Sequence, residues 1–352
     1  MSVQAEKLRD RLLEEEFNAE ILPTNPPLPK ALRALERVPI VRTVFREVQY
    51  LTSLLRVLRE PGIVHHFSAS YLYFCLHSAP LLLLGRWTRS KIILNYRGGK
   101  AANFLRKWQW FVLPLLRRAN EIVVPSEFLR KVFQNFGLHS TLLPNLADTE
   151  LFHFAEKKQF MPRLLVTRNL EPIYDVESVL RAFQIVQDKM PQASLGIAGD
   201  GSEVNKLRAI VGELNLRNVI FYGAIPHKAL PAIYRQYDIY VNASRVDNFP
   251  GTLIEASCAG LPIVTTNAGG IPEMIRDGEN GLLCAVGDSV GLADGILHLL
   301  KHQEFAQLLA QNARVWAEQF SWRNVLPRLL QCYGLCNENP AATLTSYQPV
   351  AP

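Results

Sequence analysis

Two hydrophobic periods alternate along the second half of the chain. From Arg163 to about His302, short runs rich in β-branched residues are separated by longer segments whose apolar residues recur every three or four positions. Six short runs are strand candidates: Arg163–Arg168, Ala193–Ala198, Val219–Tyr222, Asp238–Val241, Pro262–Thr266 and Gly281–Ala285. Strands that alternate with amphipathic helices predict βαβ units, and therefore a parallel sheet with helices on both faces.

The first half repeats this pattern less regularly. Its strand candidates are Gly62–Ala69, Lys91–Tyr96, Glu121–Pro125 and Ser140–Leu143. The chain opens with an amphipathic segment, Gln4–Phe17, and no strand candidate precedes it. Because a doubly wound domain normally begins with a strand and a tight turn, we expect an α/β fold of two similar domains in which the first lacks its initial strand.

The length of 352 residues suits two domains. We predict a first domain at 1–150 and a second at 151–320. A C-terminal helix is expected at 321–336, with Ser321 as its cap and an apolar face. The tail at 337–352 is rich in Asn, Thr and Pro, so we expect it to be disordered.

Charge is distributed unevenly between the two halves. Residues 1–150 hold 21 Lys and Arg against 13 Asp and Glu, whereas the remaining residues hold 17 against 19. The basic half suggests an anionic partner. The segment Lys30–Glu60 sets Lys and Arg among apolar residues, which fits either an anionic membrane surface or a solvated helix face. Nucleic acid is not expected as a partner, because the chain has no recognition motif or aromatic stacking platform.

The cysteines and the hydropathy of the chain indicate where in the cell the protein is expected. The five cysteines are scattered without the spacing of a metal site, which favours a reducing compartment. The most apolar run, Leu72–Leu84, is interrupted by His77 and Pro80 and is shorter than the roughly 18–20 residues that a bilayer span needs. We therefore expect a cytoplasmic protein, either free or peripheral on the inner face of the membrane.

Candidate chemistry lies where strands end, because ligands of open α/β sheets bind beyond the carboxyl ends of the strands. Arg168 ends the first strand of the second half, and a guanidinium there can hold a diphosphate through two parallel hydrogen bonds. An ion pair with Glu171 is the alternative. The next strand runs into Gly199-Asp200-Gly201, which allows either close approach to a ligand or a plain turn.

Two further strand ends carry similar features. After Asn242 an irregular loop leads into a helix near Gly251, whose free N–H groups favour a phosphate or a sugar hydroxyl. Glu255 lies one turn into that helix and can accept from a pair of sugar hydroxyls, or it can act only on the helix dipole. The segment Asn267–Glu273 has two glycines and a helix start that can cap the same phosphates.

Together these strings resemble glycosyltransferase family 4, retaining enzymes of the GT-B fold in which two Rossmann-like domains face each other across a cleft. The resemblance covers roughly Gly62 to Tyr333 and is strongest from Arg163 to Asp288. The matching pieces are Val124-Pro125-Ser126-Glu127-Phe128, Pro144-Asn145 with Asp148 and Phe152, Arg168-Asn169-Leu170-Glu171-Pro172, Gly199-Asp200-Gly201, Asp247–Glu255, Ala259-Gly260-Leu261-Pro262, Gly269-Gly270-Ile271-Pro272-Glu273 and Asp277-Gly278 with Gly281.

The resemblance implies roles for individual residues. Arg168 would bind the diphosphate of a nucleotide sugar, Glu255 its ribose, and Asp247 the hydroxyls of the transferred sugar. The rest of the implied donor site is Gly199, Gly201, Asn248, Phe249, Pro250, Gly251, Thr252, Leu253, Gly269 and Gly270. No metal and no cofactor besides the donor substrate is implied, because cations and helix N-termini do the work of a divalent ion.

Three departures from the family pattern stand out. The first carboxylate of the usual Glu pair is Asp247, shorter by one methylene, and the Lys usually found five residues after the Arg is Ile173. Arg245 or Arg97 are candidate substitutes for that cation. The missing first strand would also remove the Gly-rich turn that approaches donor and acceptor in this family. Either the start is truncated, or the chain is a non-catalytic nucleotide-sugar or glycan-binding relative, which is the alternative to an active transferase.

In this family the C-terminal helix crosses back to the first domain, and the first domain selects the acceptor. Its strand ends supply His65, His66 and Ser68, followed by Arg97 and Lys100. The histidines could polarise an acceptor hydroxyl or simply be packed, whereas Arg97 and Lys100 suit an acceptor phosphate. The sequence therefore predicts a glycosyltransferase that moves a sugar from a nucleotide diphosphate to a glycolipid, a polysaccharide or another glycan acceptor.

Overall fold

The chain forms two compact units. The computed structural model describes residues 2–26, 39–154, 157 and 159–335. Of these, the first unit contains the residues up to Leu146 and those from Pro327 on, and the second contains Ala147–Leu326. The tail predicted at 337–352, and Lys30, Arg33 and Arg37 of the basic segment, lie outside the described residues.

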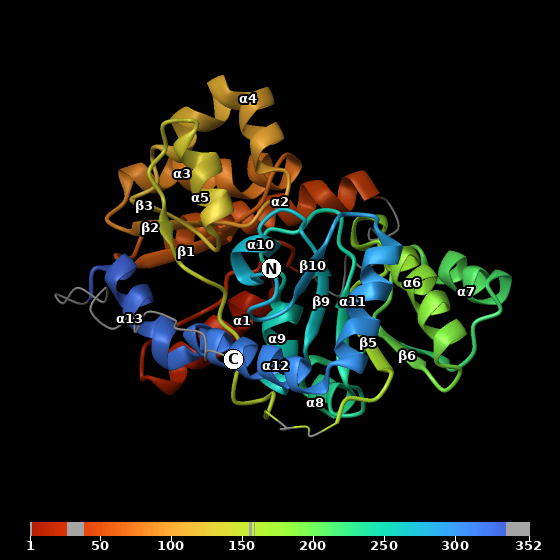
Figure 1. Ribbon diagram of the computed structural model, residues 1–352. Helices are drawn as coiled ribbons and strands as arrows, with labels where there is room; N and C mark the ends of the chain where they lie inside the picture. Colours follow the sequence, from red (N-terminus) through yellow and green to blue (C-terminus); the bar gives the residue numbers. More distant parts are fainter. Residues whose placement is uncertain (1, 27–38, 155–156, 158, 336–352) are drawn as a thin grey trace. The chain divides into compact units, whose positions relative to one another are not determined.

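The first unit is built on a four-stranded parallel sheet in the order β1-β2-β3-β4 (Figure 1). Its strands are β1 (Ile63–Ser68), β2 (Lys91–Tyr96), β3 (Glu121–Val124) and β4 (Thr141–Leu142). Within the described part of the chain, two helices but no strand precede β1, as the sequence predicts. From Ile92 to Tyr96 strand β2 is buried throughout, which is typical of a parallel strand covered on both faces.

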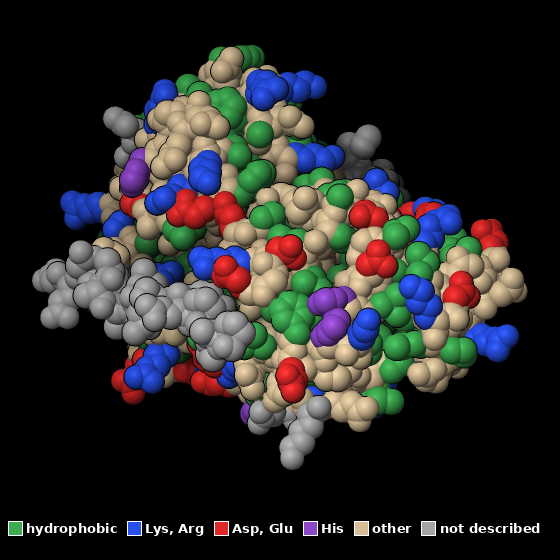
Figure 2. Space-filling model, viewed as in Figure 1, with side chains coloured by type: hydrophobic (Ala, Val, Ile, Leu, Met, Phe, Trp, Pro, Cys, Tyr) green, Lys and Arg blue, Asp and Glu red, His purple; other side chains and the backbone are tan. Residues whose placement is uncertain are grey.

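The first unit also contains several helices and helical turns. They are α1 (Ser2–Glu14), α2 (Pro39–Val57), a π-helical turn η2 (Phe74–Ser78), α3 (Ala79–Leu84), a 3-10 turn η3 (Gly85–Trp87), α4 (Ala101–Leu116) and α5 (Glu127–Gln134). The Ser126 hydroxyl caps α5 by accepting from the Leu129 amide at 3.3 Å. Basic side chains lie over α4, at the top of Figure 2.

The second unit contains a six-stranded parallel sheet in the order β10-β9-β8-β5-β6-β7. The strands are β5 (Arg163–Thr167), β6 (Ser194–Ala198), β7 (Val219–Gly223), β8 (Ile239–Asn242), β9 (Ile263–Thr266) and β10 (Leu282–Cys284). Strand β5 pairs with β6 on one side and with β8 on the other. The strand order therefore reverses between β5 and β8, which makes a Rossmann sheet with its topological switch point at that place.

Helices cover both faces of this sheet. They are α6 (Val176–Lys189), α7 (Val204–Glu213), α8 (Leu230–Tyr234), α9 (Gly251–Ala259), α10 (Ile271–Met274), α11 (Ser289–Lys301) and α12 (Gln303–Ala317), with 3-10 turns η4 (Pro172–Tyr174), η5 (His227–Ala229) and η6 (Glu318–Phe320). Leu164 and Leu165, consecutive in β5, belong to different apolar clusters because successive strand residues point to opposite faces.

The predicted elements are confirmed closely. Each of the ten predicted strands is present with ends within one residue of the expected ones. The helix expected at Gln4–Phe17 ends earlier, at Glu14. The last helix, α13 (Trp322–Tyr333), begins in the second unit, and its residues from Pro327 on belong to the first. No described helix is long and apolar enough to span a bilayer.

Candidate active site

Arg168 and Asp247 meet at the switch point of the second sheet. Arg168 directly follows β5, and Asp247 lies in the loop after β8. Arg168 Nη2 forms an ion pair with Asp247 Oδ2, and Nη1 donates to Thr252 Oγ1 at 3.3 Å. The guanidinium carbon lies 4.0 Å from the centroid of the Tyr174 ring. The sequence places these groups at two strand ends, and the fold brings them together.

The pair is largely withdrawn from solvent. The Arg168 side chain is 8% exposed and that of Asp247 is 14% exposed. Burial is the strongest single influence and acts to lower the pKa of Arg168. The Asp247 carboxylate, Tyr240 and Tyr174 together outweigh it, so the pKa is raised and the guanidinium stays charged. Within the described structure Arg168 Nε is buried without a hydrogen-bond partner. Orphaned buried donors are rare in folded proteins and are often found at functional sites.

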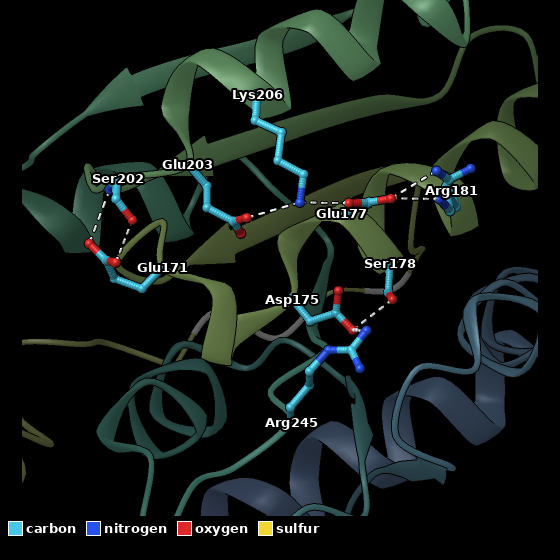
Figure 3. A network of polar contacts seen from close by, with 9 residues as sticks. All are labelled: Glu171, Asp175, Glu177, Ser178, Arg181, Ser202, Glu203, Lys206 and Arg245. Atoms are coloured by element: carbon cyan, nitrogen blue, oxygen red, sulfur yellow. Dashed lines mark hydrogen bonds and ion pairs between the residues drawn. The ribbon is translucent and has the colours of Figure 1, made fainter.

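Glu171, the alternative partner considered for Arg168, binds elsewhere. Its carboxylate accepts from the Ser202 amide at 3.0 Å and from the Ser202 hydroxyl at 2.6 Å (Figure 3). These bonds lower the pKa of Glu171, the side-chain bond most strongly. Glu171 thus links the turn after β5 to the turn after β6. It is not the partner of Arg168, which pairs with Asp247.

Glu255 is held by two side chains from other elements. It lies one turn into α9, and its Oε1 is 3.0 Å from His227 Nε2. Its Oε2 accepts from the Tyr234 hydroxyl at 3.1 Å. His227 Nδ1 is also 3.7 Å from Asp148 Oδ2. Sequence analysis missed His227, whose only signal is its position a few residues beyond the end of β7.

A buried set of hydroxyls connects Glu255 to the central strand. The Thr167 hydroxyl at the end of β5 lies 2.6 Å from the Tyr234 hydroxyl and 3.2 Å from that of Tyr240. Burial and the neighbouring Glu255 charge raise the pKa of Tyr234 well above its usual value, so its hydroxyl remains a hydrogen-bond donor. The carboxylate orientation is therefore fixed from inside the sheet.

The predicted glycines allow neighbouring turns to touch. A Cβ on Gly199 would lie 1.8 Å from the Arg168 carbonyl oxygen, and one on Gly201 would lie 2.4 Å from that of Leu170. Gly269 has φ +56° and approaches the Asp247 carbonyl, and the Gly270 amide donates to that same oxygen at 2.9 Å. These glycines position Arg168 and Asp247, and their own contact with a donor stays a prediction.

The remaining predicted donor residues belong to the same loop and helix. The Phe249 amide donates to Asp247 Oδ1 at 3.2 Å, which fixes the carboxylate. Leu253 is fully buried in the apolar cluster, so only its backbone is available. Asn248 and Pro250 are buried, whereas Gly251 and Thr252 at the start of α9 are partly exposed.

Arg245, a candidate substitute for the missing Lys, lies beside position 173. Its amide donates to the Ile173 carbonyl at 2.8 Å. Its guanidinium, however, pairs with Asp175 at 2.9 Å, and Asp175 also accepts from the Ser178 hydroxyl (Figure 3). Arg245 is therefore neutralised by a carboxylate at the start of α6.

The predicted acceptor residues lie in the first unit. His66 Nε2 is 2.9 Å from the Ser78 hydroxyl, which is also 2.8 Å from that of Ser68, and these three residues are buried. Burial lowers the pKa of His66 to about 3, so it is neutral. Contact of His66 or Ser68 with an acceptor stays a prediction, one that this placement does not favour.

His65 and Arg97 share a chain of hydrogen bonds. His65 Nδ1 is 3.0 Å from the Tyr333 hydroxyl, and its Nε2 is 3.0 Å from Asn95 Nδ2. Arg97 Nε donates to Asn95 Oδ1 at 3.1 Å. Both His65 nitrogens are occupied, and burial followed by the Arg97 charge lowers its pKa to about 3. Lys100 is exposed at the start of α4.

Comparison with known families agrees with this geometry. Residues 148–316, which include Arg168, Asp247 and Glu255, match the family of glycosyl transferases group 1. The matched residues make up most of the second unit.

Individual relatives are similar over longer stretches. The chain is 28% identical over 201 residues to N-acetyl-alpha-D-glucosaminyl L-malate synthase of Bacillus anthracis, which covers 57% of this chain and 51% of that one. It is 25% identical over 286 residues to sulfoquinovosyl transferase SQD2 of Arabidopsis thaliana, covering 75% and 54%. The chain spans about half the length of these curated relatives.

A solved structure shows the same fold. The HepE protein of Anabaena, in complex with UDP and glucose, superimposes with a TM-score of 0.72 at 18% identity and covers 95% of this chain and 94% of its own. The two parallel α/β units thus have the GT-B fold, as predicted.

Proposed function

We propose that this protein is a retaining, metal-independent glycosyltransferase that moves a sugar from a nucleotide diphosphate sugar to a glycan or lipid-linked acceptor. The observation that carries the proposal is the cluster of Arg168, Asp247 and Glu255 at the switch point of the second sheet. Ligands of Rossmann sheets bind at this place.

In this proposal Arg168 stabilises the departing nucleotide diphosphate. Its guanidinium is charged, buried and already oriented by Asp247 and Tyr174, so little reorganisation is needed when negative charge develops. Asp247 takes up hydroxyls of the transferred sugar while it keeps Arg168 in place. The uncapped start of α9, at Gly251, offers further backbone N–H groups to a phosphate.

Glu255 would bind the ribose of the donor. A carboxylate can accept from two hydroxyls at once, and Glu255 has lone pairs left beyond those used by His227 and Tyr234. Solved structures of the same fold support a nucleotide diphosphate donor, because HepE was crystallised with UDP-glucose and TarM of S. aureus with UDP.

An anionic membrane surface is the proposed location of the acceptor, reached from the cytoplasm. Helix α2 exposes an apolar stripe at helical spacing, each residue 40% exposed or more: Val41, Val44, Val48 and Leu55. Arg56 and Arg59 are exposed at its end. Val48→Asp is expected to weaken binding to vesicles of anionic lipid, and wild-type protein that ignores such vesicles at low ionic strength would contradict this location.

The proposed activity is tested by incubating the protein with UDP, GDP, ADP and CDP sugars and glycan acceptors in the presence of EDTA. We expect one donor to give a product that retains the anomeric configuration of the donor sugar, as read by NMR, and Arg168→Ala to abolish it. Transfer that requires a divalent ion, or an inverted product, would contradict the mechanism. Donor binding without transfer would favour the non-catalytic alternative.

A further inference from the structure

Arg97 is a partly buried arginine that forms no ion pair with a carboxylate of the described residues. It directly follows β2, its amide donates to the Ser68 carbonyl at 3.0 Å, and its guanidinium carbon lies 4.9 Å from the centroid of the Phe67 ring. Arg163 and Arg168 each pair with an Asp. In the part of the chain that the structure describes, no Asp or Glu pairs with Arg97.

Burying the charge of Arg97 in this place is energetically unfavourable unless an anionic group binds to it. Removing a charge from water without a counter-charge is unfavourable, and burial accordingly lowers the pKa of Arg97 to about 9. The guanidinium still carries its proton at neutral pH. Only Nε has a hydrogen-bond partner among the described residues, so the Nη groups are available.

The chain of hydrogen bonds behind Arg97 fixes its orientation. Because an arginine can only donate, Asn95 Oδ1 must accept, and the Asn95 amide must then donate to His65 Nε2. His65 therefore carries its proton on Nδ1 and donates to the Tyr333 hydroxyl. These hydrogen bonds hold Nε of Arg97 in place and leave both Nη groups without a hydrogen-bond partner among the described residues.

The loop after Arg97 is also fixed. A Cβ on Gly98 would lie 2.4 Å from the Ser70 hydroxyl and 2.9 Å from that of Tyr96, so this turn packs closely against the turn after β1. Lys100, three residues after Arg97, is exposed on the same loop. Two cations thus lie three residues apart on one turn, and Arg97 is pre-oriented.

We propose that Arg97, with Lys100 beside it, binds an anionic group of the acceptor, a phosphate or a carboxylate. The planar Nη edge of a guanidinium matches the paired oxygens of either group. The acceptor is therefore acidic: it carries a phosphate or a uronic acid. This assignment rests on the proposed transferase function and names its substrate class. Asn95, His65 and Tyr333 are positioning residues.

The full chain, without nucleotide, is titrated with inorganic phosphate, glucuronate and neutral glucose at low ionic strength by calorimetry. We expect wild type to bind phosphate or glucuronate and not glucose, and Arg97→Gln to weaken the anion about tenfold or more, as for loss of a charged hydrogen bond. Arg106→Gln, which removes an exposed charge from α4, is the matched control and should bind like wild type. The tighter anion tells whether the acceptor carries a phosphate or a uronate.

The proposal is overturned if wild type binds neither anion, or if Arg97→Gln binds the anion as wild type does. Arg97→Lys is the control for a folding defect, because it keeps the positive charge and loses only the planar guanidinium. It should bind the anion several-fold more weakly than wild type. Wild-type affinity in Arg97→Lys contradicts the proposed recognition. Stabilisation by the cognate nucleotide should be unchanged in Arg97→Gln. Failure of this subsite therefore differs from failure of the donor site, which rests on Arg168.

Discussion

The Gly199→Ala substitution tests the close approach that positions Arg168. Gly199 has φ +152°, which L side chains rarely adopt, and a Cβ there would lie 1.8 Å from the Arg168 carbonyl oxygen. Neither backbone can move freely, because the Gly199 amide donates to the Gly223 carbonyl at 2.8 Å and the Arg168 amide donates to the Ala198 carbonyl at 3.1 Å. The added methyl must strain both turns.

The expected magnitude has two parts. A residue forced into this region of φ and ψ costs about 1–3 kcal/mol. Overpacking against a fixed backbone adds about 1–3 kcal/mol. We therefore expect Gly199→Ala to lower the free energy of unfolding of the second unit by about 2–6 kcal/mol, and to displace Arg168 from Asp247.

Urea unfolding and nucleotide binding measure the two effects, and Gly212→Ala is the matched control. Gly212 lies on α7, and a Cβ there would meet nothing within 4 Å. The same chemical change should therefore stabilise the protein by about 0.5–1 kcal/mol, through helix propensity alone. A Gly199→Ala protein as stable as wild type, with unchanged nucleotide affinity, would show that this turn accommodates a Cβ without displacing Arg168.

Substitutions of three polar side chains test their hydrogen bonds and ion pairs. Asp247→Asn leaves the Arg168 charge unpaired and should cost about 3 kcal/mol in urea unfolding, whereas an unchanged stability would mean that the pair is dispensable. His227→Ala releases one oxygen of Glu255, so under the proposed function KM for the donor should rise about tenfold with kcat nearly unchanged; an equal fall in kcat would place His227 in the chemistry. Burial lowers the pKa of His66 to about 3 in the folded protein. Between pH 6.5 and 3 the imidazole is therefore protonated in the unfolded chain but not in the folded one. The free energy of unfolding should fall by about 1.4 kcal/mol for each pH unit in this range. In His66→Gln this part of the slope should disappear from unfolding curves; an identical slope in both proteins would contradict the buried, neutral histidine.

The sequence predicts what depends on local pattern and on parallel topology. Arg168 and Asp247 each follow a buried strand, and parallel strands bring their carboxyl ends to one edge of the sheet. The strands themselves are short apolar runs between amphipathic helices, which is why their ends could be placed within one residue. The glycines were likewise found from their strand exits.

Partners distant in sequence were not predictable in this way. His227 meets Glu255 across 28 residues, and His65 meets Tyr333 across 268, and neither side chain has a local signal for its partner. The choice of Asp247 rather than Glu171 as partner of Arg168 depends on side-chain direction after folding. The positions of the glycines were predicted, but their packing of turn against turn appears only in the structure.

In the proposed donor site, the second unit binds a nucleotide diphosphate through Arg168 and Glu255. The most direct test is the thermal stability of the chain with UDP, GDP, ADP and CDP, in wild type, Arg168→Ala and Glu255→Ala. A ligand at 100 times its dissociation constant adds about 2.7 kcal/mol, enough to raise the melting temperature by several degrees. We predict that one nucleotide raises the melting temperature of wild type and of neither variant. No shift in wild type, or the same shift in all three proteins, would contradict the account.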